Sequence, residues 1–313
     1  MQAYRSVPPG IFRPDEKLGF PVFIERDQRL VTLVRKGACF PDRASLNLEQ
    51  EPVIYVRERD LEQAYRHAGR HLDAILADAS IPASLKATIF YTSAAQTMQA
   101  IFDDPRAELI GRMQASVRSL VRSISANQKI LEELFRITAH DYCTYTHSLN
   151  VGIFATALAL KYFGASPGSL DDLERFCYGF FLHDIGKSLV PREIINKPEE
   201  LSAEEWSLMR KHPEHGYAIL MGSAQLTDEA AYITLEHHEK FGGGGYPYGR
   251  KGNQIHPCAR ICAIADSFDA LTTVRAYKPA LSPYEALRIM QQEMLHEFDY
   301  DFLQVFIRLL GPA

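Results

Sequence analysis

The hydrophobic pattern of this 313-residue chain changes once, near residue 59, and no other feature constrains the fold as strongly. Before that point, three short segments rich in Val, Ile and Phe predict strands at 21–25, 30–34 and 52–56. After it, apolar residues recur at helical spacing, and no later run alternates for long enough to predict a sheet. We therefore expect a mainly α protein, in which a small α+β module precedes an all-helical domain.

The helical part of the chain contains one break and one long amphipathic stretch. The second predicted helix begins at Pro82, a residue favoured in the first helical turn, and Asp103 to Pro105 end it. From 109 to 135 the apolar residues follow one helical stripe, which is typical of a helix that connects two modules. We place the boundary near residue 125. The module at 1–125 is expected to serve sensing or dimerisation, and 126–313 is the second domain.

Charge and composition argue against several classes of protein. Lys plus Arg number 34 against 39 for Asp plus Glu, and this net charge of -5 disfavours a surface that grips DNA, RNA or an anionic membrane. No apolar run approaches the roughly 18 residues of a membrane helix, and the N-terminus lacks the pattern of an export signal. Five scattered cysteines predict neither a disulfide framework nor a zinc knot. We expect a cytoplasmic protein.

Histidine is concentrated in one part of the helical region. Seven of the eleven histidines fall between 147 and 256, where uniform scatter would put about four. Among them, His183 and Asp184 follow an apolar segment at 178–182, where burial of an unpaired carboxylate costs on the order of several kcal/mol. Imidazole and carboxylate are ligands that first-row transition metals prefer, and a carboxylate can bridge two metals. The pattern therefore predicts a metal site.

Several cations accompany this predicted metal site. Lys187 follows Asp184 by three residues and lies on the same face if the helix continues, where a cation can hold a phosphate oxygen. Arg275 and Lys278 follow Asp266 by two to three helical turns and bring positive charge back toward the same region. We therefore expect an anionic ligand beside the metals.

A glycine run lies close to the histidines. Gly242 to Gly245 cannot form a helix interior, so they predict a loop whose backbone can approach a ligand, and the adjacent Tyr246 can stack on a base. His212 and His215 lie one turn apart, and their spacing leaves both open as ligands.

In its order of motifs, the chain resembles the HD-GYP family, bacterial phosphodiesterases of the HD superfamily that degrade cyclic di-GMP. The resemblance covers about residues 138–311. The motifs that carry it are His147, His183-Asp184-Ile185-Gly186-Lys187, His212-Pro213 with Gly216, His237-His238-Glu239, Gly245-Tyr246-Pro247, Ala265-Asp266-Ser267-Phe268-Asp269-Ala270 and Arg275-Ala276-Tyr277.

The resemblance implies a helical domain that holds two or three ions of iron or manganese, bridged by the aspartate of the His-Asp pair, and a metal-activated water that attacks phosphorus. The implied ligands are His147, His183, Asp184, His212, His237, His238 and Asp266. The family's His-Pro-x-x-Gly pattern selects His212 over His215, and Asp269 is implied as a support behind the ligands.

The resemblance also implies roles around the substrate. Asp184 and Lys187 are the catalytic residues, and Lys187 contacts the scissile phosphate. Arg275 and Lys278 are implied as further phosphate contacts, whereas Tyr246 is expected as a substrate contact because its ring can stack on a base. The implied reaction is hydrolysis of cyclic di-GMP to pGpG in bacterial second-messenger signalling, and further hydrolysis to GMP is left open.

Two positions depart from the family pattern. Cys143 stands where members with a third metal carry Glu, so we expect two divalent transition metals, iron or manganese, rather than three. Gly242 stands where the family usually has Asp, which removes a hydrogen-bonding anchor and predicts a more mobile loop. Whether substrate affinity and partner docking differ from those of the family is therefore left open.

Two other functions remain open from the sequence. One is an HD-type phosphohydrolase of another nucleotide, and the other is a catalytically weak receptor for cyclic di-GMP. A homodimer through the N-terminal module or the long helix, and signalling partners at the glycine loop, also remain open, whereas DNA, RNA and membrane partners are not expected.

Overall fold

The computed structural model describes residues 3–14, 16–26, 29–41, 53–138, 144–164, 169–224, 226–274 and 279–311. The chain divides into two compact units, Met1–Ser93 and Ala94–Ala313. Within the described residues, none of the helices combines the length and apolar character required to cross a membrane.

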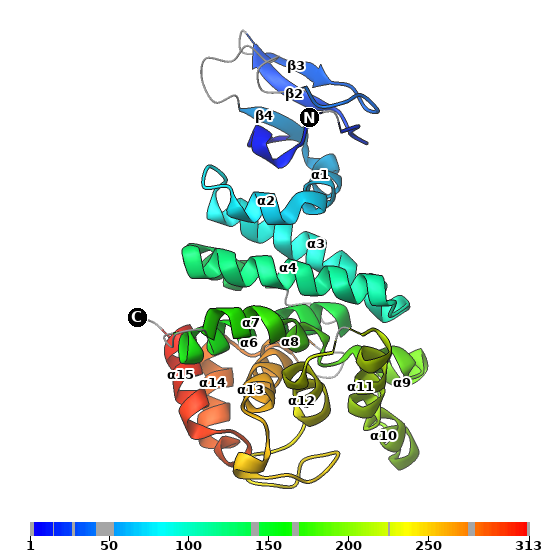
Figure 1. The fold of residues 1–313 in the computed structure, drawn as a ribbon, viewed down its shortest axis with the longest axis vertical. Helices are drawn as coiled ribbons and strands as arrows, with labels where there is room; N and C mark the ends of the chain where they lie inside the picture. The colour runs from blue at the N-terminus through cyan, green and yellow to red at the C-terminus, as the bar shows by residue number, and fades with distance from the viewer. Residues whose placement is uncertain are drawn as a thin grey trace. The chain divides into compact units, whose positions relative to one another are not determined.

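The first unit contains a four-stranded antiparallel sheet (Figure 1). Its strands are β1 (Tyr4–Val7), β2 (Val22–Arg26), β3 (Arg29–Val34) and β4 (Ile54–Arg57), in the spatial order β1-β4-β2-β3. The three predicted strands are confirmed to within two residues. The sequence did not predict β1, because a strand of four residues is too short to show a clear alternation of apolar and polar side chains. The position of β1 is set by its pairing with β4.

Helices follow the sheet in the first unit. They are α1 (Leu61–Ala68), α2 (Leu72–Ala77) and the first part of α3 (Ala83–Asp103), which continues past Ser93 into the second unit. A 3-10 turn at Pro9–Ile11 lies between β1 and β2, and two others lie at Glu58–Asp60 and Gly69–His71. The predicted start at Pro82 lies one residue before the observed start, and the predicted end at Asp103 is confirmed. Together with the helical second unit, this arrangement confirms the mainly α fold.

Within its described residues, the regular elements of the second unit are helices joined by loops (Figure 1). Its helices are α4 (Ala107–Ala126), α5 (Lys129–Ile137), α6 (Thr144–Phe163), α7 (Ser169–Phe176), α8 (Tyr178–Leu182), α9 (Arg192–Ile195), α10 (Ala203–Met209), α11 (His212–Gly222), α12 (Asp228–Glu236), α13 (Pro257–Thr272), α14 (Pro283–Gln292) and α15 (Tyr300–Leu310), with 3-10 helices η4 (Ile185–Leu189), η5 (Gly252–Gln254) and η6 (Leu295–Glu297).

The amphipathic stretch from 109 to 135 forms two helices rather than one. Asn127 leaves the helical region of backbone conformation and ends α4. The apolar face of α4 packs against α7 and α8, and Arg122 of α4 forms a 2.7 Å ion pair with Glu174 of α7. The compact units divide at Ser93, within α3, and α4 belongs to the second unit. The domain boundary near residue 125 stays a prediction from the sequence.

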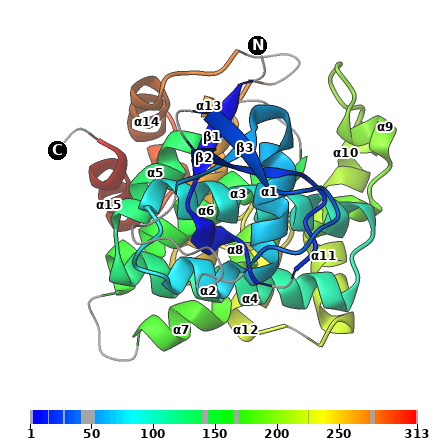
Figure 2. The same cartoon turned by 90° about the horizontal axis from the view of Figure 1, so that it is seen from above.

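The core of the second unit surrounds α6. Every residue of α6 from His147 to Ala159 is buried, because α8 and α13 pack on it and α5 and α15 cover further faces. A helix that is buried on all sides can present a polar group only to the protein interior. Helices α9 and α10 lie at the opposite edge of this unit from α14 and α15 (Figure 1 and Figure 2).

Candidate metal centre

Five segments of the helical unit contribute His and Asp side chains to one buried region. Most of these residues stand at helix ends, where side chains from several helices can converge. They are His147 on α6, His183 and Asp184 directly after α8, His212 at the start of α11, His237 and His238 directly after α12, and Asp266 on α13.

Gly186 allows α11 to approach the His183-Asp184 segment. A Cβ atom on Gly186 would overlap the backbone oxygen of His212 and would lie 2.5 Å from the backbone nitrogen of Gly216. Only a residue without a side chain permits this backbone contact. The glycine after Asp184 therefore lets the first residue of α11 lie beside that carboxylate.

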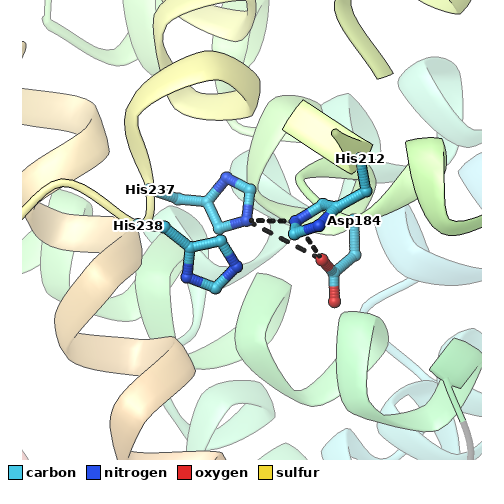
Figure 3. Close-up of side chains that lie close together, drawn as sticks. All are labelled: Asp184, His212, His237 and His238. Carbon is cyan, nitrogen blue, oxygen red and sulfur yellow. Dashed lines mark hydrogen bonds and ion pairs between the residues drawn. The ribbon is translucent and has the colours of Figure 1, made fainter. Parts of the chain in front are cut away.

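The first group of ligand atoms comes from Asp184, His212, His237 and His238, which Figure 3 shows converging. The Oδ1 atom of Asp184 lies 3.1 Å from Nε2 of His212 and 3.7 Å from Nε2 of His237. The two Nε2 atoms of His212 and His237 are 3.2 Å apart. His238 completes the group, since the four ligand atoms all lie within 4.8 Å of one another and thus within reach of one cation.

The second group comes from His147, His183 and Asp266. Nε2 of His147 lies 3.0 Å from Oδ1 of Asp266. The Oδ2 atom of Asp184 faces the same group, at 3.3 Å from Nε2 of His183 and 3.6 Å from Nε2 of His147. Asp184 therefore presents one carboxylate oxygen to each group, which is the arrangement of a bridging ligand.

Hydrogen bonds fix the ring orientation of four histidines. The Nδ1 atoms of His183, His212 and His237 face backbone carbonyls of Phe180, Met209 and the 233–234 segment at 2.8–3.1 Å. Since a carbonyl only accepts, each Nδ1 carries the proton and each Nε2 is left with its lone pair toward the site.

For His147, a carboxylate takes the place of the carbonyl. Its Nδ1 donates to Oδ2 of Asp269 at 2.7 Å, and Oδ1 of Asp269 accepts from Nδ2 of Asn150 at 2.9 Å. All three side chains are buried. An outer carboxylate of this kind orients a metal-binding imidazole and raises its basicity. The contact agrees with the supporting position expected for Asp269.

The buried polar atoms fit divalent cations. Nε2 of His183 and Oδ1 of Asp184 are buried, and neither forms a hydrogen bond with the described residues. Buried groups of this kind are costly to leave unsatisfied, and one cation at each ligand group would satisfy them. The seven donors are imidazole nitrogens and carboxylate oxygens, a set that suits first-row divalent metals.

The electrostatic environment keeps most of these side chains in the protonation state that binds a metal. Burial raises the pKa of Asp184, but Lys187 and the neighbouring histidines lower it well below its usual value. Burial lowers the pKa of His237 to about 4, so that its ring stays neutral. His147 is the exception, because hydrogen bonds to Asp266 and Asp269 overcome the effect of burial and raise its pKa to about 10. A cation must therefore displace a proton from His147.

Two residues expected to contact substrate lie beside these groups. Lys187 belongs to η4, and its Nζ atom is 2.5 Å from Oδ2 of Asp184. The ring of Tyr246 stacks on His238, with centroids 4.6 Å apart and an interplanar angle of 26°. The guanidinium of Arg210 lies over the same ring at 5.4 Å. Arg275, Lys278 and Cys143 lie outside the described residues.

The glycine loop is confirmed as a loop, and backbone contacts hold it in place. Gly243 and Gly244 adopt positive φ angles of 94° and 82°, a region that favours glycine. Gly242 donates its N–H to the carbonyl of His296 at 2.8 Å, and a Cβ atom here would lie 2.6 Å from that oxygen. The loop therefore has a backbone anchor where the sequence predicted the loss of a side-chain anchor.

The structure brings together residues that the sequence analysis did not select. Asn150 stands three residues after His147 on the same face of α6, and this spacing was visible in the sequence. Arg210 reaches Tyr246 from α10, and no spacing in the sequence reveals that contact. His215 lies outside both ligand groups, whereas His212 lies within the first.

Comparisons with known proteins place an HD domain in this part of the chain. Residues 170–302 match the family described as HD domain. The chain is 33% identical over 228 residues to Cyclic di-GMP phosphodiesterase PA4108 of Pseudomonas aeruginosa, covering 72% of this chain and 54% of that protein. It is 39% identical over 128 residues to Cyclic di-GMP phosphodiesterase response regulator RpfG of Xanthomonas campestris pv. campestris, covering 41% and 34%.

A third relative carries a different substrate in its name. The chain is 40% identical over 136 residues to 3′3′-cGAMP-specific phosphodiesterase 2 of Vibrio cholerae, covering 43% of this chain and 25% of that protein. The chain thus spans about half the length of the first relative, and a smaller share of the other two.

One solved structure matches nearly the whole chain. Bd1817, a HDG"Y"P protein from Bdellovibrio bacteriovorus, has a TM-score of 0.67 at 20% identity, covering 99% of this chain and 100% of that one. At this identity the match shows the fold alone. Together the comparisons confirm the fold class and the resemblance on which the sequence analysis rested.

Proposed function

We propose that this chain, which carries an HD domain and is related to the HD-GYP proteins, hydrolyses the phosphodiester bonds of cyclic di-GMP. The proposed reaction depends on metal ions and gives pGpG and then GMP. The single observation that carries the proposal is Asp184, a buried carboxylate with one oxygen directed at each of two groups of metal-ligand atoms.

The proposed ligands are the seven side chains of the two groups, and the proposed metals are two ions of iron or manganese. His147, His183 and Asp266 form a two-histidine, one-carboxylate set, a composition that suits non-haem Fe(II). When bound, paired divalent cations lower the pKa of a water nucleophile and offset negative charge on the phosphoryl oxygens.

The chain's own residues prepare this site. The carbonyl and carboxylate partners of the four Nδ1 atoms hold the Nε2 atoms toward the metals. We propose that Lys187, whose ammonium lies beside Asp184, also holds an oxygen of the scissile phosphate. Arg275 and Lys278 stay proposed phosphate contacts on the basis of the sequence.

A second candidate substrate is 3′3′-cGAMP, because one relative is named as specific for that dinucleotide. It has the same phosphodiester ring and differs in one base, so the metal chemistry serves both substrates. The choice between them must come from residues that contact the bases.

The test uses anaerobically purified full-length protein whose metal content has been measured. The protein is incubated separately with cyclic di-GMP and 3′3′-cGAMP, and products are identified by chromatography. Turnover of cyclic di-GMP with pGpG appearing first supports the proposal. Stoichiometric binding without product would contradict it and favour a receptor, and preferential turnover of 3′3′-cGAMP would change the proposed substrate.

A further inference from the structure

A line of aromatic and cationic side chains leads from the metal-ligand groups toward the protein surface. The ring of His238 stacks on Tyr246 with centroids 4.6 Å apart. Arg210 lies 5.4 Å from the centroid of Tyr246 and 5.8 Å from the centroid of Trp206. We call these four residues, His238, Tyr246, Arg210 and Trp206, the aromatic ladder.

Helix α10 fixes the outer half of the aromatic ladder. Trp206 and Arg210 are four residues apart, so both lie on one face of the helix. A capping box formed by Ser202 and Glu205 holds the start of α10. Arg210 ends the helix two residues before His212. This short connection couples the position of the ladder to that of a proposed metal ligand.

The exposed end of the ladder has the chemistry of a base-binding surface. Trp206 is 47% exposed and is the only tryptophan in the sequence. Arg210 is exposed, and its guanidinium forms no ion pair with the residues that the structure describes. An indole face beside a cation whose charge is not compensated suits a planar base attached to a phosphodiester.

The inner rings are less suited to this role. Tyr246 already contacts both His238 and Arg210 through its ring, and His238 belongs to the first ligand group. Within the ladder, the most exposed aromatic surface therefore belongs to Trp206 rather than to Tyr246, the base contact expected from the sequence.

We propose that Trp206 stacks on one purine base of the cyclic dinucleotide whose phosphodiester lies at the metal groups. Arg210 holds the indole in position and adds positive charge near the same nucleotide. This inference rests on the proposed function and extends it, because the metal groups alone do not explain how the bases are bound.

The test compares three variants of the metal-loaded full-length protein with the parent. Trp206→Ala removes the stacking surface, and Trp206→Phe retains a smaller one. The matched control is Leu208→Ala, because Leu208 lies on the same helix, is 44% exposed, and points about 200° away from Trp206. KM and kcat are measured with cyclic di-GMP, together with metal content and melting temperature.

Loss of one stacked base should raise KM by about ten- to a hundredfold in Trp206→Ala, with kcat and metal content unchanged. Trp206→Phe should recover most of the loss, and Leu208→Ala should behave as the parent. Fluorescence of the single tryptophan should be quenched when cyclic di-GMP binds to the parent or to Leu208→Ala.

An unchanged KM in Trp206→Ala, while the parent hydrolyses cyclic di-GMP, would overturn the role of the ladder and leave the proposed function intact. Equal losses in Trp206→Ala and Leu208→Ala would also overturn it, because they would indicate a general disturbance of α10. If the parent neither binds nor hydrolyses cyclic di-GMP, the proposed function fails and the ladder's role fails with it.

Discussion

Replacement of Asp269 by Asn should weaken metal binding although Asp269 belongs to neither ligand group. The buried carboxylate accepts from Nδ1 of His147 at 2.7 Å and from Nδ2 of Asn150 at 2.9 Å. An amide has one acceptor and one donor in place of two acceptors. After Asp269→Asn, the N–H of either His147 or Asn150 therefore faces the N–H of the new amide and loses its hydrogen-bond acceptor.

The magnitude follows from these two contacts. Leaving one buried donor unpaired costs about 1–3 kcal/mol, and loss of an outer partner of a metal-binding histidine typically costs about 10–100-fold in metal affinity. If His147 moves its proton to Nε2 to satisfy the amide, the nitrogen that faces Asp266 can no longer bind a metal. We expect about a ten- to hundredfold loss of affinity at the group that contains His147.

The assay is a chelator-competition titration with Mn²⁺, which resolves the two affinities, accompanied by melting curves without metal. Combining Asp269→Asn with Asn150→Asp supplies a carboxylate that accepts from the new amide, so the amide oxygen can again face His147. The double variant should recover part of the lost affinity. Parental affinities in Asp269→Asn, or a double variant no better than the single one, would refute the reasoning.

Three further predictions concern single residues and pH. Lys187→Ala should lower kcat/KM by about ten- to a hundredfold, because it removes the proposed charged contact to the phosphate. Its metal content should be nearly unchanged, and a loss of metal would instead show that Lys187 organises the metal site. Cys143→Ser should retain two metals per chain by elemental analysis and near-parental hydrolysis in the product assay. The reason is that iron or manganese sites rich in oxygen and nitrogen ligands gain little from a soft thiolate. A third fully occupied metal in the parent would overturn this expectation. For metal-free protein, melting curves between pH 4 and 10 should show that the stability contributed by neutral His237, present above pH 6.5, is lost as the pH falls toward about 4. Protonated His147 contributes stability below pH 6.5 that is lost as the pH rises toward about 10, so a stability that rises steadily with pH would contradict the two assignments.

The seven side chains that the resemblance implied as ligands lie together in the structure, because several of them stand in short motifs with fixed local geometry. His183 precedes Asp184 directly, and Gly186 follows where α11 approaches, so one motif carries two ligands and the contact that places a third. The helical spacing predicted the mainly α fold, and the break from Asp103 to Pro105 predicted the end of α3 at Asp103.

Other features depend on contacts between distant segments and could not be predicted in this way. The apolar stripe of α4 looks the same whether it connects two modules or covers a core, and only its packing on α7 and α8 distinguishes them. The loss of a side-chain anchor at Gly242 was visible, but the compensating backbone bond to His296 was not. The contact between Arg210 and Tyr246 also joins segments far apart in the sequence.

The most direct test of the two-metal hydrolysis mechanism compares the parent with Asp184→Asn in metal content and in hydrolysis of cyclic di-GMP. An amide cannot supply the anionic bridge that we propose for the two oxygens of Asp184, which face the two groups. We predict two metals per parent chain with pGpG formed first, and loss of both full metal occupancy and hydrolysis in Asp184→Asn. Near-parental metal content and hydrolysis in that variant would contradict the account.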